Sequence, residues 1–197
     1  MVTTGVSCWL SCVFLLISGW AVAESALAPE RGRLLVATEQ VQGTVFKQSV
    51  VLLIAHGAGG AAGVILNQPT EMQLSRILPQ YQAPLADRVM YRGGPLQPFN
   101  LFMLIRTKRT HPTMSAILDD IYVAAGARAF VHIAGQVTAD EKLRVYAGLS
   151  GWAPGQLEAE IRRGDWLVVP AAAVDVLSDA PQSLWRQLMK QWSGHWI

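Results

Sequence analysis

Residues 147–161 have the sequence Ala-Gly-Leu-Ser-Gly-Trp-Ala-Pro-Gly-Gln-Leu-Glu-Ala-Glu-Ile, which predicts the end of a strand, a glycine turn around a tryptophan and an abrupt helix start. Pro154 suits the first turn of a helix, where its missing N–H is not needed. Leu157 and Ile161 are four residues apart and therefore share one helix face. Gly164 is a suitable helix end. We expect a strand-to-helix corner with demanding backbone geometry.

The first 23 residues differ in kind from the rest of the chain. Residues 6–20 are almost wholly apolar, and Ala21-Val22-Ala23 is a small-x-small pattern typical of a signal cleavage site. The apolar run is short for a membrane span. We predict a secretory signal peptide over residues 1–23 and a periplasmic or secreted protein. Because residues 1–5 carry no positive charge, an uncleaved N-terminal anchor and a cytoplasmic protein with a mis-assigned start remain alternatives.

Composition narrows the function classes for the remaining residues, 24–197, which we expect to form a single domain. Both cysteines, Cys8 and Cys12, lie in the predicted signal, so the mature chain would have no disulfide, no thiol chemistry and no cysteine-based metal site. The formal net charge of +2 is near neutral and does not favour direct nucleic-acid binding. Contact with a membrane is expected only through residues 1–23, if they are not cleaved.

The pattern of apolar runs predicts an α+β fold. About seven or eight short strands are expected, at 33–38, 49–56, 64–67, 88–92, 101–106, 121–125, 143–148 and 166–169. Helical spacing occurs at 72–78, 127–133, after Pro154 and at 181–192, and residues 80–87 are expected to form a polar loop. The glycine-rich residues 57–63 separate two strand-like runs and indicate a hairpin. Regular alternation of strands and helices is missing, which favours α+β over a doubly wound sheet.

Five short motifs follow one another along the chain. They are Gly-Arg-Leu-Leu-Val-Ala at 32–37, Phe-Lys-Gln-Ser-Val at 46–50, His56 with Gly-Ala-Ala-Gly-Val-Ile-Leu-Asn-Gln-Pro at 60–69, Gly-Gly-Pro at 93–95, and Gly-Trp-Ala-Pro-Gly-Gln-Leu-Glu-Ala-Glu-Ile at 151–161, with Trp166 shortly after. In these motifs the chain resembles the YqgE/AlgH family of bacterial proteins, over residues 32–192. It departs from the family where Gly43-Thr44-Val45 replaces an Asp-Pro lead and where Gln68 replaces an arginine.

The resemblance implies a fold more than a function. It implies a mixed, strongly bent β-sheet, a pseudo-barrel, flanked by helices in a single domain. The family is largely uncharacterised, with a proposed role in transcriptional regulation, and its typical members lack a signal peptide. A recognition helix with clustered lysines and arginines is not visible in this sequence. We expect a non-enzymatic binding or regulatory protein whose partner, a protein or a small molecule, is unknown.

A serine hydrolase is the alternative. His56-Gly57 and the following glycines resemble an oxyanion loop, and Ser150 lies in a near match to Gly-x-Ser-x-Gly. Asp175 or Asp179 with His195 would complete the order of a catalytic triad. However, the chain returns directly to a strand after Gly63, and the helix after Ser150 starts too late for a nucleophile elbow. We therefore assign no catalytic residue.

The sequence points to a binding cleft between the 56–69 hairpin, the 93–95 turn and the 151–160 corner. The candidate binding residues are His56, Asn67, Gly93, Gly94, Trp152, Gln156 and Glu158. Each has a structural alternative: a strand-end turn for the asparagine, packing for the tryptophan, and the helix dipole for the carboxylates. The four histidines, at 56, 111, 132 and 195, lack metal-ligand spacing, so no metal or cofactor is expected.

Overall fold

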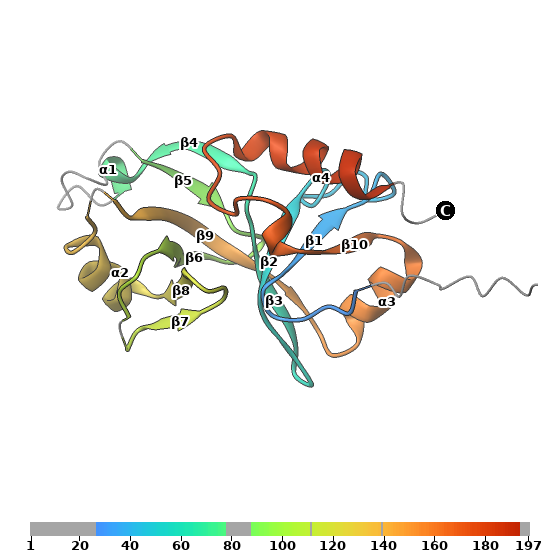
Figure 1. Cartoon of the computed structure of the whole chain (residues 1–197), viewed down its shortest axis with the longest axis horizontal. Coiled ribbons are helices and arrows are strands. Elements are labelled where there is room, and N and C mark those ends of the chain that lie inside the picture. Colours follow the sequence, from blue (N-terminus) through green and yellow to red (C-terminus); the bar gives the residue numbers. More distant parts are fainter. Residues whose placement is uncertain (1–26, 78–87, 111, 139, 194–197) are drawn as a thin grey trace, which may run out of the picture.

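One long strand, β9 (Lys142–Trp152), belongs to both halves of the sheet in the computed structural model of the chain. The structure describes residues 27–77, 88–110, 112–138 and 140–193. The first part of β9 pairs with β6, and its last three residues pair with β3. Figure 1 shows β9 crossing the molecule between these two halves. The predicted signal at 1–23, the loop at 80–87 and His111 and His195 lie outside the described residues.

The described residues form ten strands and four α-helices. The other strands are β1 (Arg33–Ala37), β2 (Val50–Gly57), β3 (Gly60–Ile65), β4 (Pro69–Gln73), β5 (Val89–Arg92), β6 (Leu96–Arg106), β7 (Met114–Ala116), β8 (Ile121–Ala125) and β10 (Trp166–Pro170). The helices are α1 (Leu74–Ile77), α2 (Ala127–Ala134), α3 (Gln156–Arg163) and α4 (Leu184–Trp192). Short 3-10 helices occupy Ala171–Ala173 and Pro181–Ser183.

The sheet is mixed and strongly curled, as the sequence predicted. Its order is β10-β1-β2-β3-β9-β6-β8-β7, and every neighbouring pair in this series is antiparallel. β5 adds a parallel pairing to β9, and β4 pairs with β5. The result is a half-barrel flanked by helices, with α4 and α3 on opposite faces of β1 (Figure 1). The prediction of an α+β pseudo-barrel is therefore confirmed.

Strand β1 explains how the sheet organises the core. Successive side chains of a strand point to opposite faces. Leu34 therefore joins the cluster that includes Leu184 and Leu188 of α4, whereas Leu35 joins the cluster that includes Leu157 of α3. A third cluster fills the space between α2 and strands β6 and β9. Both faces of β1 are buried, which is why its sequence is apolar without alternation.

The backbone of the turn after β5 approaches β9 closely. The Gly93 N–H donates to the Ala147 carbonyl at 2.8 Å, and the Gly93 carbonyl accepts from the Ile65 N–H at 2.9 Å. The same carbonyl accepts a hydrogen bond from Ser150 Oγ at 3.2 Å. A Cβ at Gly93 would lie 2.2 Å from the Gly148 carbonyl oxygen. Three strands are thus joined at a position that has no room for a side chain.

The strand-to-helix corner at residues 147–161, which we call the signature corner, differs from its prediction in where the strand ends. Gly151 and Trp152 remain in β9, because they pair with Ala62 and Ala61 of β3. The turn comes afterwards, and α3 begins only at Gln156. The proline at 154 therefore precedes the helix rather than lying in its first turn. The predicted features of the helix itself, a buried Leu157 and an end at Gly164, are present.

Three other predicted boundaries change because the residues concerned pair with another strand. The predicted helix at 72–78 shortens to α1, because Pro69–Gln73 pair with β5 as β4. The glycine-rich turn shortens, because residues 60–63 extend along β2 as part of β3. The strand expected at 101–106 starts at Leu96, and β7 was not predicted.

We expect Gly93→Ala to destabilise the fold by about 3 kcal/mol, because the new methyl group meets backbone atoms that cannot rotate away. Gly59→Ala is the matched control, since a Cβ there has nothing within 4 Å. It should cost less than about 0.5 kcal/mol. Urea unfolding followed by tryptophan fluorescence measures both. Equal losses in the two variants would contradict the close-approach argument.

Candidate functional site

Glu160 is the centre of the hydrogen-bond network at the signature corner. Its Oε2 accepts from Nε1 of Trp152 and Nε1 of Trp166, each at 2.8 Å, and its Oε1 accepts from Nε2 of Gln156 at 2.9 Å. The two indoles are buried and meet edge-to-face, with ring centroids 5.9 Å apart, and Phe46 packs against both. A buried indole N–H needs an acceptor. One carboxylate supplies it for both rings, which accounts for the motif's spacing.

His56 and Glu158 join the β2–β3 hairpin to α3. The His56 Nε2 and Glu158 Oε1 atoms are 2.8 Å apart. Backbone hydrogen bonding at the start of the helix and the bond to His56 lower the pKa of the Glu158 carboxyl. Gln156 supports the same turn, because its Oε1 accepts from the Ala153 N–H at 3.0 Å. These groups are partly exposed or exposed, but they are bonded to one another.

Asn67 has a backbone role. Its Oδ1 accepts from the Val50 N–H at 2.9 Å, and its Nδ2 donates to the Gln48 carbonyl at 2.8 Å. It also lines an open hollow of about 600 Å³, together with Arg92 and residues from the start of β4. The structure therefore supports the strand-end alternative for this residue and places a hollow beside it.

The seven predicted binding residues fall into two groups. His56, Trp152, Gln156 and Glu158 meet at the corner, whereas Asn67, Gly93 and Gly94 hold strands together. Gly93 and Gly94 are buried against the backbone of β9. Their assignment as binding residues stays a prediction, and the contacts give each of them a structural role.

Ser150 has the surroundings of a structural serine. It is fully buried, and its Oγ donates to the Gly93 carbonyl. The imidazole of His56 is bonded to Glu158 rather than to Ser150. Asp175, a candidate for the third member of a triad, is bonded to Arg106 at 2.8 Å. Within the described ranges, Ser150 has no hydrogen bond to a histidine that could act as its base.

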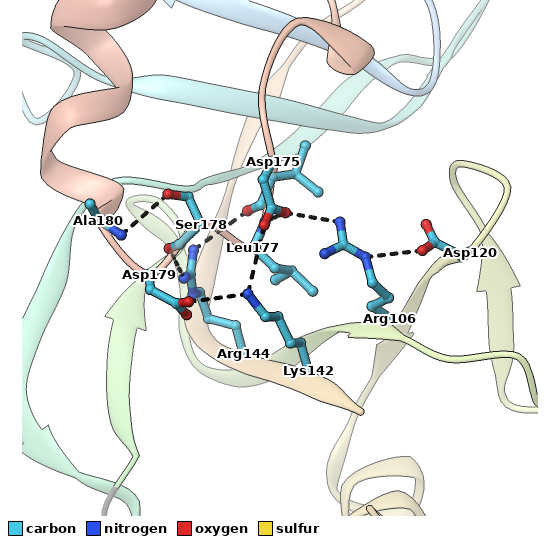
Figure 2. A network of polar contacts seen from close by, with 10 residues as sticks. Arg106, Asp120, Lys142, Arg144, Asp175, Leu177, Ser178, Asp179 and Ala180 are labelled. Atoms are coloured by element: carbon cyan, nitrogen blue, oxygen red, sulfur yellow. Dashed lines mark hydrogen bonds and ion pairs between the residues drawn. The ribbon is translucent and has the colours of Figure 1, made fainter. Parts of the chain in front are cut away.

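A charged network occupies the opposite end of β9. Arg106 contacts Asp120 at 3.0 Å and Asp175 at 2.8 Å. Lys142, directly across from Arg106 in the sheet, contacts Asp175 at 3.7 Å and Asp179 at 3.2 Å. Figure 2 shows these side chains linking the strands to the segment that precedes α4. The pairs are exposed, so each contributes little to stability.

Arg144 in the same network has no acidic partner. It is 9% exposed, and its guanidinium lies 4.4 Å from the centre of the Tyr91 ring. It donates to the Ser178 carbonyl at 2.6 Å and to the Val176 carbonyl at 3.5 Å (Figure 2). Among the described residues, no carboxylate lies within 4.0 Å of it. Within the described residues, this buried cation is therefore in contact with carbonyl groups and an aromatic ring rather than with a carboxylate.

Arg88 is a second arginine that is bonded to a carbonyl group, and it is partly buried. It donates to the Leu143 carbonyl at 2.6 Å, and in the part of the chain that is described it forms no ion pair. Burial lowers the pKa of the Arg88 guanidinium, although an arginine stays charged at neutral pH. Uncompensated cations are costly to bury. Two of them at one place therefore call for an explanation beyond stability.

Arg88 and Arg144 line the same cavity, which has a volume of about 360 Å³ and which we call the basic hollow. Its lining comprises the cations Arg88, Lys142 and Arg144, the apolar or aromatic Val89, Tyr91, Leu143 and Leu177, and the acids Glu141 and Asp179. Asp179 is 91% exposed and therefore lies at the entrance.

Glu141 does not neutralise the arginines of the basic hollow. Its carboxylate accepts from Arg109 at 2.9 and 2.6 Å, from the Thr107 hydroxyl and from the Thr138 N–H. Burial by itself would raise the pKa of Glu141, but these hydrogen bonds lower it to about 2. The carboxylate thus belongs to the turn at 138–141 and to the loop at 107–109.

Sequence reasoning missed the basic hollow because its residues come from separate strands and a loop. One local signal was available. In Leu143-Arg144-Val145-Tyr146, the arginine stands at a position that faces the same side of the strand as a buried tyrosine. A charged residue in that position indicates either a paired ion or a site.

The fold is that of a one-domain α+β protein built on a curled, mixed sheet. The AlgH-like family model matches residues 34–196, and the chain belongs to this family. A UPF0301 protein of Mycobacteroides abscessus is 34% identical over 184 residues, covering 88% of this chain and 87% of the relative. A UPF0301 protein of Mycobacterium tuberculosis is 33% identical, with 86% of each chain covered. The predicted family resemblance is therefore confirmed.

Two solved structures share the fold. The solution structure of the AlgH protein from Pseudomonas aeruginosa has a TM-score of 0.65 and 25% identity, covering 84% of this chain and 87% of its own. A crystal structure of a protein from Corynebacterium diphtheriae has a TM-score of 0.62 and 26% identity, covering 83% and 94%. These similarities support the family and the fold.

The described residues contain no helix with both the length and the apolarity that a membrane crossing requires. In the same residues, no three His, Cys, Asp or Glu side chains gather in a way that would hold a metal ion.

We expect Glu160→Ala to cost about 3 kcal/mol, because it leaves the N–H groups of Trp152 and Trp166 without an acceptor. Glu158→Ala removes a partly exposed carboxylate from the same helix and should cost less than about 1 kcal/mol. Urea unfolding measures both losses, and the emission maximum of the tryptophans reports their surroundings. Similar losses in the two variants would mean that the indole contacts contribute little.

Glu141 makes stability depend on pH. Because its folded pKa is about 2 and its ordinary value is 4.5, its contribution is complete above pH 4.5 and disappears as the pH falls toward 2. At neutral pH this contribution is about 3 kcal/mol. Glu141→Gln should therefore unfold more easily at pH 7 and lose less stability between pH 4.5 and 2. Parallel pH profiles for the two proteins would rule out this role.

Proposed function

We propose that this chain is a non-enzymatic binding protein with a regulatory role, and that the basic hollow takes its ligand. The observation that carries the proposal is the pair of cations Arg88 and Arg144, which line one cavity without an acidic partner among the described residues. A cavity of about 360 Å³ is within the size range of small-molecule sites. The ligand would supply the acidic partner that Arg88 and Arg144 lack among the described residues.

The groups that suggested catalysis form structural hydrogen bonds with other parts of the fold. A nucleophilic serine needs a base within hydrogen-bond reach. The hydroxyl of Ser150 donates to the Gly93 carbonyl, and the imidazole of His56 is hydrogen-bonded to Glu158. The serine-hydrolase alternative thus gains no supporting contact from the described residues.

A regulatory role would act through the bound ligand or a protein partner. The near-neutral charge of the chain and the acidic side chains of Asp120, Asp175 and Asp179 do not favour direct contact with nucleic acid. The proposed role in transcription that is attached to the family would then be indirect in this protein.

A screen of the purified full chain tests the proposed function. Small metabolites are added singly, the melting temperature is recorded, and each stabilising compound is recovered and identified by mass spectrometry. We expect stabilising compounds to be recovered unchanged, because a binding protein gains stability from its ligand without converting it. Ester hydrolysis and labelling by a fluorophosphonate probe are measured in parallel.

The matched control for the screen is Ser150→Ala. We expect the wild type and this variant to show the same background ester hydrolysis and the same absence of labelling. Turnover or labelling that is present in the wild type and lost in the variant would overturn the non-enzymatic assignment.

A further inference from the structure

We infer that the basic hollow binds the phosphate group of a small organic phosphate monoester, an inference that rests on the proposed binding function and names its ligand class. Arg88 is the residue before β5, and Lys142 and Arg144 are the first and third residues of β9. All three line the hollow. The three cations thus come from two neighbouring strands that pair side by side in parallel. A tetrahedral oxyanion can accept hydrogen bonds from several directions at once.

The hydrogen-bonding capacity of the two arginines is only partly used. A guanidinium carries five N–H donors. Arg144 uses two of them, on the Val176 and Ser178 carbonyls, and Arg88 uses one, on the Leu143 carbonyl. The ring of Tyr91 and the carbonyls hold the Arg144 guanidinium in place before any ligand arrives. A donor group that is already oriented binds an anion at a lower entropic cost.

The charges of the hollow favour an anion. The carboxylates near Lys142 are shared with that lysine and with Arg106, and Glu141 is held by Arg109. The lining of the hollow therefore holds three cations and two carboxylates, and neither carboxylate forms an ion pair with Arg88 or Arg144. A phosphate monoester carries close to two negative charges at pH 7, since its second pKa is about 6. Its three terminal oxygens also offer the two guanidinium groups more acceptors than the two oxygens of a carboxylate do.

The rest of the hollow fits an organic group rather than a free phosphate ion. Tyr91, Leu143 and Leu177 provide an aromatic and apolar wall. An extended polyanion fits less well, because the exposed carboxylates of Asp179 and Asp175 lie beside the cations and would repel neighbouring phosphates. Figure 2 shows both carboxylates next to Lys142 and Arg144. A single phosphate on a small apolar body matches this arrangement.

The test uses phenyl phosphate and the purified full chain in isothermal titration calorimetry at pH 7.5. Benzoate and phenol are the matched ligands with one negative charge and none, and a single-stranded deoxythymidine decamer represents nucleic acid. We expect phenyl phosphate to bind at least about tenfold more tightly than benzoate, which corresponds to one additional charge-assisted hydrogen bond. Phenol and the decamer should bind more weakly than phenyl phosphate.

Arg88→Gln should weaken phenyl phosphate binding about tenfold, because a charge-assisted donor is lost. Arg92→Gln is the matched control: it removes the same charge from the exposed end of β5, where the side chain lines the hollow beside Asn67 instead. It should change the affinity by less than about twofold. If circular dichroism shows that Arg88→Gln is unfolded, Lys142→Gln replaces it and should also weaken binding.

Several outcomes would overturn the inference. They are equal binding of benzoate and phenyl phosphate, tighter binding of the decamer, equal effects of Arg88→Gln and Arg92→Gln, and no binding of phenyl phosphate to the wild type. None of these outcomes would overturn the non-enzymatic assignment, which fails if a stabilising compound is converted or if turnover or labelling is lost in Ser150→Ala.

Discussion

The close approach of the 93–95 turn to β9 is the constraint on which the structure depends. At this point the Gly93 carbonyl accepts hydrogen bonds from β3 and from Ser150, and the Gly93 N–H donates to β9. The junction lets β9 leave β6 and continue along β3, so that one strand serves both halves of the curled sheet. The signature corner then forms at one end of β9 and the basic hollow at the other.

The two ends of β9 differ in how their polar groups are satisfied. At the corner, the carboxylate of Glu160 accepts from two indoles and an amide, and the pair of His56 and Glu158 links α3 to the hairpin. Polar detail of this kind gives a buried junction one defined arrangement. It explains why the corner is rich in glycine, tryptophan and carboxylates without requiring a ligand.

At the basic hollow, the polar groups are satisfied only in part. Carbonyl groups and the Tyr91 ring hold the cations in position, but carbonyls do not neutralise a charge. The nearby carboxylates are bonded to Arg106, Arg109 and Lys142. The contrast with the self-contained corner is the reason for placing ligand binding here and not at the motif that is most conspicuous in the sequence.

The sequence was sufficient for the family, the α+β class, most strands and the end of α3 at Gly164, because these depend on local periodicity and on turn residues. The tertiary structure decided the rest. Pairing with β3 keeps Gly151 and Trp152 in a strand, and pairing with β5 turns residues 69–73 from a predicted loop and helix start into β4. Asn67 was given a backbone alternative, but its bonds reach Val50 and Gln48, 17 and 19 positions away, so they depend on the pairing of β3 with β2. Arg88 and Arg144 could not be grouped in advance, because they are 56 positions apart and only the parallel pairing of β5 with β9 brings them to one cavity.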